Sequence, residues 1–326
     1  MVMAESSPVP DSELFYGSYD GVFKPHLVRV AILLDVFTPL AGQPLDAKSL
    51  AHAIGAHAEG IERLAAYLVA IGLLETLDGR FSLTPSAQAF LVPASKAYAG
   101  DLILGFTGPE FWERVTTSLR SGKPASLLER FDQDAWVESY RTSRIASSLE
   151  MWRAAGVQPG LQAEVRILDL ACGCGIKSFC LAQGEPRVRV TCVDQAGVLA
   201  VAQDLAERMG IADRVRLVPG DLRSLPLGEA EHEACLAGQI THYLTEEQNN
   251  ALFHRVYAAL VGGGKLLIDA PMGRIEPDET AAFLSLVLWA NSGGTAYTFE
   301  AYQQWLHASG FSRIRRTGER WIVAVK

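Results

Sequence analysis

Basic residues are scarce in this chain of 326 residues: 29 Lys and Arg stand against 37 Asp and Glu, a net charge of −8 at pH 7. Nucleic-acid binding requires a concentrated basic face, so we expect no nucleic-acid partner. Long apolar runs are also missing. The longest, residues 27–40, carries Arg29 and Asp35 and predicts a buried helix, so we expect no membrane partner either.

Signals for export are absent as well. Residues 1–13 contain neither a basic segment nor an apolar core, so we interpret them as a disordered tail rather than a signal peptide. The five cysteines are an odd number set among predicted core strands, which is typical of a reducing compartment and predicts a cytoplasmic protein. Cys172 and Cys174 form a C-x-C pair without the second ligand pair of a zinc site, so we expect no metal.

Residues 14–98 predict a small, mainly helical domain with a winged-helix pattern. Residues 15–40 have apolar side chains on nearly every face, which must be covered from within the chain or by a second copy. Two helices follow, and Asp78-Gly79 between two short apolar segments predicts a hairpin. The second helix carries only Arg63 among basic residues, whereas a DNA-recognition helix needs several, so a winged-helix regulator is a remote alternative.

Residues 99–160 predict a helical linker whose aromatic side chains could enclose a ligand, and residues 271–291 predict a helical cover for the same pocket. Aromatic residues at helical spacing pack in cores at least as often as they line pockets, so both roles stay open. The pocket candidates are Phe106, Trp112, Trp152, Phe283 and Trp289.

Residues 161–326 alternate strand and helix patterns and end in a predicted antiparallel hairpin. This order predicts an α/β fold, a Rossmann-like doubly wound sheet that the hairpin makes mixed. A buried strand at residues 165–170 runs directly into a turn with Gly173 and Gly175 and then a helix. Such a turn lets the backbone approach a ligand closely. A dinucleotide fingerprint would have a third glycine at Ser178, which disfavours a nicotinamide oxidoreductase.

Acidic residues mark the ends of three predicted strands. Asp169 lies near the end of the first, Asp194 ends the second 19 residues after Gly175, and Asp221 ends the third. A carboxylate at the position of Asp194 can accept both ribose hydroxyls of a nucleoside. The alternatives are a helix cap at Asp194 and an ordinary turn at Asp221.

From about residue 15 to residue 326 the chain resembles the small-molecule O-methyltransferases that use S-adenosylmethionine and have a winged-helix dimerisation domain. The caffeic acid and hydroxyneurosporene O-methyltransferases are examples. The matching motifs are Leu83-Thr84-Pro85, the LDLACGCG segment from Leu168, Val193-Asp194, Pro219-Gly220-Asp221 and Gly263-Gly264-Lys265. The resemblance implies a homodimer formed by the N-terminal domain, S-adenosylmethionine as cofactor, and a hydrophobic or aromatic acceptor of secondary metabolism.

Matched position by position, the resemblance also implies site residues. The cofactor-binding set is Asp169, Ala171, Gly173, Gly175, Asp194, Gln195, Asp221, Leu222, Gly238 and Gln239. His242 falls at the family's general base, although a slip of one residue would place Thr241 there. Tyr243 follows where the family has Asp, and the family's supporting Glu falls at Ala270, with Asp269 one residue earlier.

These departures affect the expected reaction. Methyl transfer needs a nucleophile held in line with the donor and the removal of one proton, and histidine suits that proton transfer because its pKa is near neutral pH. O-methylation with His242 as base is therefore our first hypothesis, with Asp269 and Tyr243 beside it. The missing carboxylates leave room for C- or N-methylation, or for a relative that does not transfer methyl groups.

Overall fold

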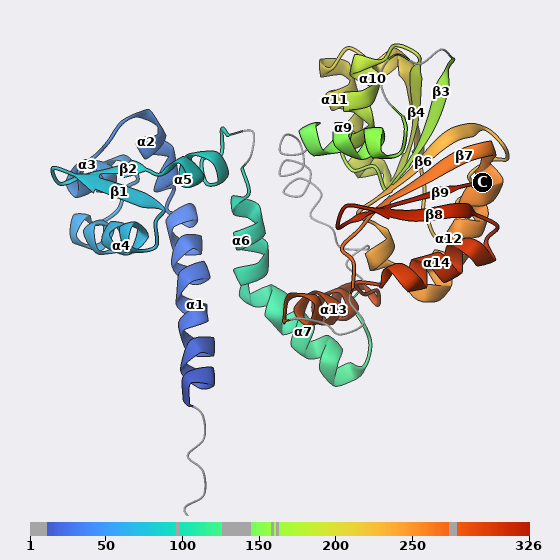
Figure 1. The fold of residues 1–326 in the computed structure, drawn as a ribbon. Coiled ribbons are helices and arrows are strands. Elements are labelled where there is room, and N and C mark those ends of the chain that lie inside the picture. The colour runs from blue at the N-terminus through green and yellow to red at the C-terminus, as the bar shows by residue number, and fades with distance from the viewer. Residues whose placement is uncertain (1–11, 96–97, 126–144, 158–159, 161–162, 274–278) are drawn as a thin grey trace, which may run out of the picture. The chain divides into compact units, whose positions relative to one another are not determined.

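A computed structural model describes residues 12–95, 98–125, 145–157, 160, 163–273 and 279–326 (Figure 1). Three aromatic residues of the predicted linker, Phe131, Trp136 and Tyr140, lie outside these ranges. The chain divides into two compact units, Met1–Phe111 and Trp112–Lys326. Among the described residues, no helix is long and apolar enough to cross a bilayer.

The first unit contains the predicted helices and hairpin. Its elements are α1 (Ser12–Leu33), α2 (Phe37–Gly42), α3 (Ala47–Ala53), α4 (Ala58–Ala70), β1 (Leu74–Leu77), β2 (Arg80–Leu83), α5 (Pro85–Phe90) and α6 (Gly100–Thr107). Asp46 caps α3 by accepting the amide of Ser49 at 2.8 Å. In the hairpin turn, Asp78 and Gly79 both have positive φ, which matches the tight turn that this pair predicts.

Part of α1 is apolar and uncovered within the chain. Its buried side packs into the core of the unit, whereas Phe23 is 42% and Leu33 is 62% exposed. A groove of about 440 Å³ lies between α1 and α4 and is lined by Leu27, Val30, Leu34, Ile61, Leu64 and Tyr67, among others. Exposed apolar area of this kind marks a surface for association.

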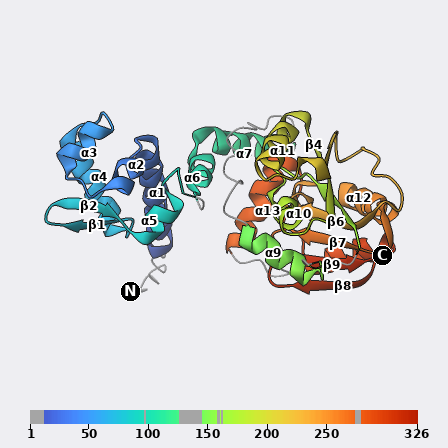
Figure 2. The ribbon, with the colours of Figure 1, turned by 90° about the horizontal axis from the view of Figure 1, so that it is seen from above.

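The second unit is built on a seven-stranded sheet of order β5-β4-β3-β6-β7-β9-β8 (Figure 2). Its strands are β3 (Val165–Leu170), β4 (Val188–Asp194), β5 (Val215–Pro219), β6 (His232–Gly238), β7 (Leu260–Asp269), β8 (Ser312–Thr317) and β9 (Trp321–Val325). Strands β3 to β7 are parallel and the last two are antiparallel. The predicted mixed, doubly wound sheet is therefore confirmed.

Helices cover both faces of this sheet. The helices of this part of the chain are α7 (Pro109–Ser121), which begins in the first unit, α9 (Ile145–Ala154), α10 (Ile176–Gly184), α11 (Ala196–Arg208), η2 (Ala212–Arg214), η3 (Thr241–Tyr243), α12 (Glu246–Ala259), α13 (Glu279–Ser292) and α14 (Phe299–Ala308). Figure 1 shows α10 and α11 on one face and α12 and α14 on the other. Each face has its own apolar core, which fits strands buried on both sides.

One boundary differs from the sequence-based expectation. Residues 262–264 are three consecutive glycines, and we expected the strand to begin after them at Lys265. Instead β7 begins at Leu260 and runs through the glycines, with a register shift against β6 between His232 and Ala234. The Cβ of a residue at Gly264 would lie 2.9 Å from the carbonyl oxygen of Val261, so this irregular pairing requires glycine.

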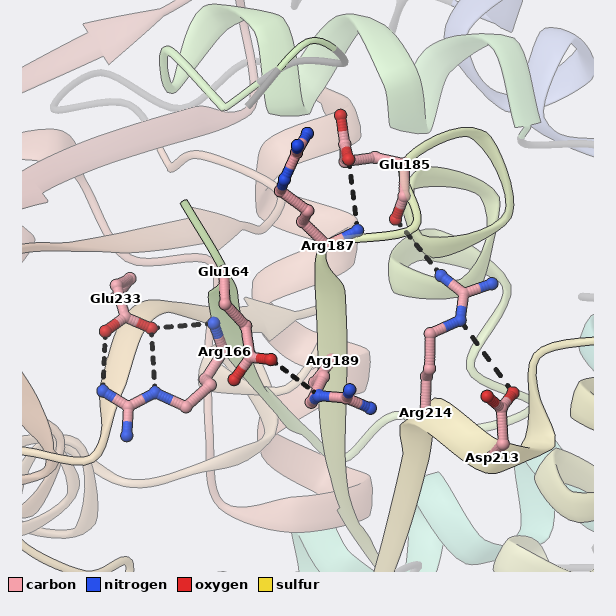
Figure 3. A network of polar contacts seen from close by, with 8 residues as sticks. All are labelled: Glu164, Arg166, Glu185, Arg187, Arg189, Asp213, Arg214 and Glu233. Carbon is pink, nitrogen blue, oxygen red and sulfur yellow. Dashed lines mark hydrogen bonds and ion pairs between the residues drawn. The ribbon is translucent and has the colours of Figure 1, made fainter. Parts of the chain in front are cut away.

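Ion pairs join the amino ends of the parallel strands. Arg166 near the start of β3 forms a two-pronged pair with Glu233 of β6, with Nη2 at 2.7 Å and Nε at 3.1 Å (Figure 3). Arg189 near the start of β4 contacts Glu164 at 2.8 Å. Exposed pairs of this kind add little stability each. They lie at the amino end of the sheet, whereas ligands of doubly wound sheets bind at the opposite, carboxyl end.

Candidate functional site

The loop after β3 has an unusual backbone that leaves space beside it. Ala171, Gly173 and Gly175 all have positive φ, at 50°, 58° and 79°. A Cβ at Gly175 would lie 2.4 Å from the ring of Phe179, so this position must be glycine. At Gly173 no atom lies within 4 Å of the position of a Cβ. The loop therefore runs straight into α10 with open space at Gly173.

Asp194 holds this loop from the neighbouring strand. It ends β4 and is half-buried; its Oδ2 accepts the amide of Gly173 at 2.9 Å and its Oδ1 accepts the amide of Gln195 at 2.7 Å. Burial raises the pKa of this carboxyl group, and the two amides oppose that effect. The capping residue of α11 is Gln195, and no side chain caps the helix. The alternative that Asp194 is a helix cap is therefore not what the structure shows.

Asp169 points into the core instead of toward a ligand. It is 2% exposed, and Ser178 donates its hydroxyl to Oδ2 at 2.5 Å. Burial raises the pKa of Asp169 to about 7, with the Ser178 bond and the charge of Lys177 opposing the rise. Asp169 thus joins the end of β3 to α10 underneath the loop. The serine that breaks the dinucleotide fingerprint is its partner.

The end of β5 lies beside Asp194, because the amide of Gly220 donates to the Asp194 carbonyl at 3.0 Å. The Asp221 carboxylate is exposed and bonds only to Arg223 among the contacts of the described residues, with Nη2 at 2.7 Å. The Arg223 guanidinium holds the pKa of Asp221 below its usual value. Leu222 is buried in the core. Asp221 therefore forms a local turn just after β5, the third strand of the predicted sheet.

The end of β6 is fixed to β7 rather than left open. Gln239 has a φ of 65°, and both its amide and its side-chain nitrogen donate to the Asp269 carbonyl, at 2.7 and 3.0 Å. A Cβ at Gly238 would lie 3.1 Å from the Lys177 ammonium nitrogen. Backbone strain of this kind is concentrated at functional sites. Gln239 therefore positions the strand end, and the ammonium lies directly above Gly238.

An ion-pair cluster that we did not predict lies at this end of the sheet. Lys177, near the start of α10, contacts Asp269 Oδ2 at 2.7 Å, and Arg320 contacts Oδ1 at 3.4 Å. Burial of Asp269 opposes ionisation, but the two cations prevail and lower the pKa of the carboxyl group. The only sequence signal was a charged residue in the largely buried start of α10, Ile176 to Phe179. The partner lies 92 residues away.

His242 lies on η3, shortly after β6, and is 4% exposed. Its ring packs on Tyr243 at 4.3 Å between centroids, and its Nδ1 has no hydrogen-bond partner within the described structure. Burial, followed by the charge of Arg320, lowers the pKa of His242 to about 3, with Lys177 adding to the effect and Asp269 opposing it. His242 is therefore neutral at every ordinary working pH, and it is a weak proton acceptor.

The neighbours of His242 favour His242 over Thr241 as the residue at the position of the family's general base. The hydroxyl of Thr241, the alternative position, is buried and shares a 2.7 Å hydrogen bond with Tyr302. The loop after α13 packs directly on η3, since a Cβ at Gly294 would lie 2.1 Å from the His242 carbonyl oxygen. Asn249 fixes η3 further by donating to the Thr241 carbonyl at 2.8 Å. Thr241 is thus a core residue, whereas His242 Nδ1 remains without a hydrogen-bond partner among the described residues.

The aromatic pocket candidates are not brought together as one set. Trp152 is fully buried in the core and donates its indole N–H to the Lys177 carbonyl at 2.7 Å, so the structure gives it a packing role instead of the expected pocket role. Phe106 belongs to the first unit. Trp112 and Phe283 contact each other at 6.3 Å between centroids and are 41% and 38% exposed. Trp289 is half-buried on α13.

Comparisons with known proteins agree with this architecture. Residues 167–264 match the model of a methyltransferase domain, and residues 17–93 match the O-methyltransferase dimerisation domain. A 3-hydroxy-5-methyl-1-naphthoate 3-O-methyltransferase from Streptomyces sahachiroi is 28% identical over 90% of this chain and 88% of its own. The tetracenomycin polyketide synthesis 8-O-methyl transferase of Streptomyces glaucescens is 28% identical over 93% and 90%.

A solved structure has the same fold. Human N-acetylserotonin methyltransferase in complex with S-adenosylmethionine has a TM-score of 0.80 at 20% identity, over 99% of both chains. With the domain matches, this fold and its strand-end loop define an S-adenosylmethionine-dependent methyltransferase. More narrowly, the chain belongs to the small-molecule O-methyltransferase family that carries an N-terminal dimerisation domain.

The residues present fit S-adenosylmethionine. Open space at Gly173 lies beside the start of α10, and the half-buried Asp194 carboxylate at the adjacent strand end can accept hydroxyl groups. The cofactor, when bound, supplies an electrophilic methyl group. We expect Gly173 and Gly175 to let the backbone approach it, Asp194 to bind its ribose, and the Asp221 turn to meet its adenine.

Proposed function

We propose that this enzyme methylates a hydroxyl oxygen of a small hydrophobic or aromatic metabolite of secondary metabolism. The observation that carries this proposal is the position of His242. It follows β6, the strand next to β3, and keeps a buried nitrogen without a partner. A neutral imidazole nitrogen there can contact the reacting hydroxyl. Tyr243 packs against the ring and Asp269 acts on it only through charge.

Product analysis tests this proposal. The purified enzyme is given S-adenosylmethionine and a panel of hydroxylated aromatic compounds, and the methylated products are characterised by mass spectrometry and NMR. A methyl signal on oxygen, together with a large loss of turnover in His242→Ala, is the expected result. Turnover of no hydroxyl compound, or full activity of the variant, would contradict it.

C-methylation is the second candidate. An L-tyrosine C(3)-methyltransferase from Streptomyces lavendulae is 26% identical over 74% of this chain and 71% of its own, so this fold also supports methylation of carbon. The family's supporting Glu is replaced by the buried Ala270 in this chain. The same NMR analysis separates the two reactions, because a new carbon–carbon bond places the methyl signal in a different region from that of a methoxy group.

We also propose that the chain forms a homodimer through its first unit. The matching dimerisation domain and the exposed apolar side chains of α1 support this arrangement. A cytoplasmic location is supported by the five cysteines, which form no disulfide in the described structure and so suit a reducing compartment. Light scattering on the purified protein gives the number of chains in the particle.

A further inference from the structure

Three charged side chains gather at the carboxyl ends of β6 and β7, from three separate elements. Lys177 comes from α10, Asp269 ends β7, and Arg320 lies in the turn between β8 and β9. Both cations contact the same carboxylate, at 2.7 and 3.4 Å. The Lys177 and Asp269 side chains are only 12% and 7% exposed, whereas that of Arg320 is 45% exposed. The cluster therefore carries one positive charge in excess, and its Lys177–Asp269 pair is largely removed from water.

This excess charge acts on His242. Gly238 pairs in register with Asp269, the Lys177 ammonium lies above Gly238, and η3 begins three residues further along the chain. Among the described residues, Arg320, Asp269 and Lys177 are the charged groups that act on the His242 ring. The His242 Nδ1 atom, enclosed in this region, has no hydrogen-bond partner among the described residues. A polar atom left in this way at a strand end points to a ligand.

The sign of the charge decides which form of the acceptor fits. A proton taken up by His242 would add a second positive charge to a poorly solvated region that already has one in excess, which is unfavourable. A negative oxygen at the same place would instead be stabilised by the surplus. The neutral imidazole can still donate an Nδ1–H hydrogen bond to such an oxygen.

We propose that the acceptor is bound and methylated as its conjugate base, with Lys177 and Arg320 offsetting the charge of an oxygen that His242 holds in place. This inference rests on the proposed O-methylation and deepens it. The substrate class is a phenol or enol whose hydroxyl is conjugated with a carbonyl or another electron-withdrawing group, because such hydroxyls ionise near neutral pH. Lys177 and Arg320 are positioning residues that no sequence motif indicated.

The methyl transfer balances in atoms and charge without a general base from the protein. The acceptor hydroxyl releases its proton to the solvent on binding. The oxygen then supplies the electron pair of the new O–CH₃ bond, while the pair of the breaking C–S bond stays on sulfur. His242 keeps the oxygen in line and does not change its protonation state during transfer.

The test reads the ionisation of a bound phenol directly, without turnover. The enzyme is loaded with S-adenosylhomocysteine, 4-nitrophenol is added, and the absorbance of the phenolate is followed against pH. We expect the bound phenol to have a pKa at least one unit below that of the free phenol, a tenfold shift in its ionisation. Arg320→Met and Lys177→Met should each abolish this shift. Arg313→Met, on the exposed part of the same hairpin, should keep it.

A double variant separates charge from structure. Lys177→Met removes the surplus charge and also leaves Asp269 with one cationic partner, whereas Lys177→Met combined with Asp269→Asn restores the surplus of one positive charge. The double variant should recover the lowered pKa of the bound phenol, which a purely structural role of Lys177 would not give. Failure of the wild-type complex to bind the phenolate, binding of the neutral phenol, or an unchanged shift in Arg320→Met would overturn the proposal.

Failure of this inference can be told apart from failure of the proposed O-methylation. If the phenolate is bound with a lowered pKa but product analysis shows a methyl group on carbon, the charge cluster is confirmed and the O-methylation fails. If hydroxyl groups are methylated but the bound phenol stays neutral, O-methylation stands and the role of the charge cluster fails.

Discussion

The Asp194 carboxylate accepts the amide of Gly173 at 2.9 Å and so fixes the loop after β3 from the neighbouring strand. The amide of Gln195 donates to the other oxygen of the same carboxylate at 2.7 Å and so fixes its orientation. We expect this carboxylate to bind the ribose of the cofactor as well.

Asp194→Ala should weaken binding of S-adenosylhomocysteine by about 10- to 100-fold, because hydrogen bonds to a charged group contribute roughly 1.5–3 kcal/mol. Isothermal titration calorimetry measures this affinity. Asp213→Ala, at the amino end of the sheet, is the control and should bind as the wild type does. Equal affinities of the two variants would show that Asp194 does not contact the cofactor.

His242→Ala should lower kcat by about 100-fold, because the reacting oxygen is then no longer held in line with the methyl group. Its affinity for S-adenosylhomocysteine should stay within about twofold, because Asp194 and the glycine loop are untouched. Steady-state kinetics and calorimetry together give both numbers. The exposed His307→Ala is the matched control. A parallel loss of turnover and cofactor affinity would indicate a structural role for His242.

Gly294→Ala should also reduce activity, although Gly294 has no chemistry of its own. The added Cβ would lie 2.1 Å from the His242 carbonyl oxygen, so η3 or the loop after α13 must move. A displaced reacting group can cost about 100-fold in rate. Gly262→Ala, where no atom lies within 4 Å of the new Cβ, is the control for the same measurement. Wild-type kinetics in Gly294→Ala would show that η3 tolerates displacement.

Local patterns allowed most of the fold to be predicted. The turn at Asp78-Gly79 depends on neighbours in sequence, and it is present. The doubly wound sheet followed from the alternation of strand and helix patterns, and the turn after β3 followed from its glycine spacing. Contacts between distant segments could not be predicted in this way. The Lys177–Asp269 pair depends on how α10 and β7 meet after folding, and the core position of Trp152 depends on how α9 packs against α10.

Asp169→Asn should change how stability depends on pH. The pKa of Asp169 is about 7 in the fold and 3.8 in the reference state, so between these values the folded chain binds the proton that the unfolded chain has lost. Stability therefore falls as pH rises from about 4 to about 7. Asparagine resembles the protonated acid and can keep the contact with Ser178. The variant should match the wild type near pH 4 and exceed its unfolding free energy by on the order of 1–3 kcal/mol at pH 8.

Urea denaturation of the cofactor-free protein at a series of pH values measures this difference. Other groups titrate equally in both proteins, so the difference between their unfolding free energies reports on Asp169 alone. Stability curves that run parallel from pH 4 to pH 8 would show that Asp169 is ionised in the fold at neutral pH.

Leu33→Glu should separate the proposed dimer. Leu33 is 62% exposed at the end of α1, so a charged side chain costs little in the isolated chain, whereas burial of an unpaired carboxylate between two copies is strongly unfavourable. The variant should shift from a dimer to a monomer in light scattering at micromolar concentration while its circular dichroism stays unchanged. Leu77→Glu is the matched control, because Leu77 is 77% exposed on the hairpin away from α1. A dimer that persists in Leu33→Glu would place the interface elsewhere, whereas dissociation by both variants would indicate a general loss of the fold of the first unit.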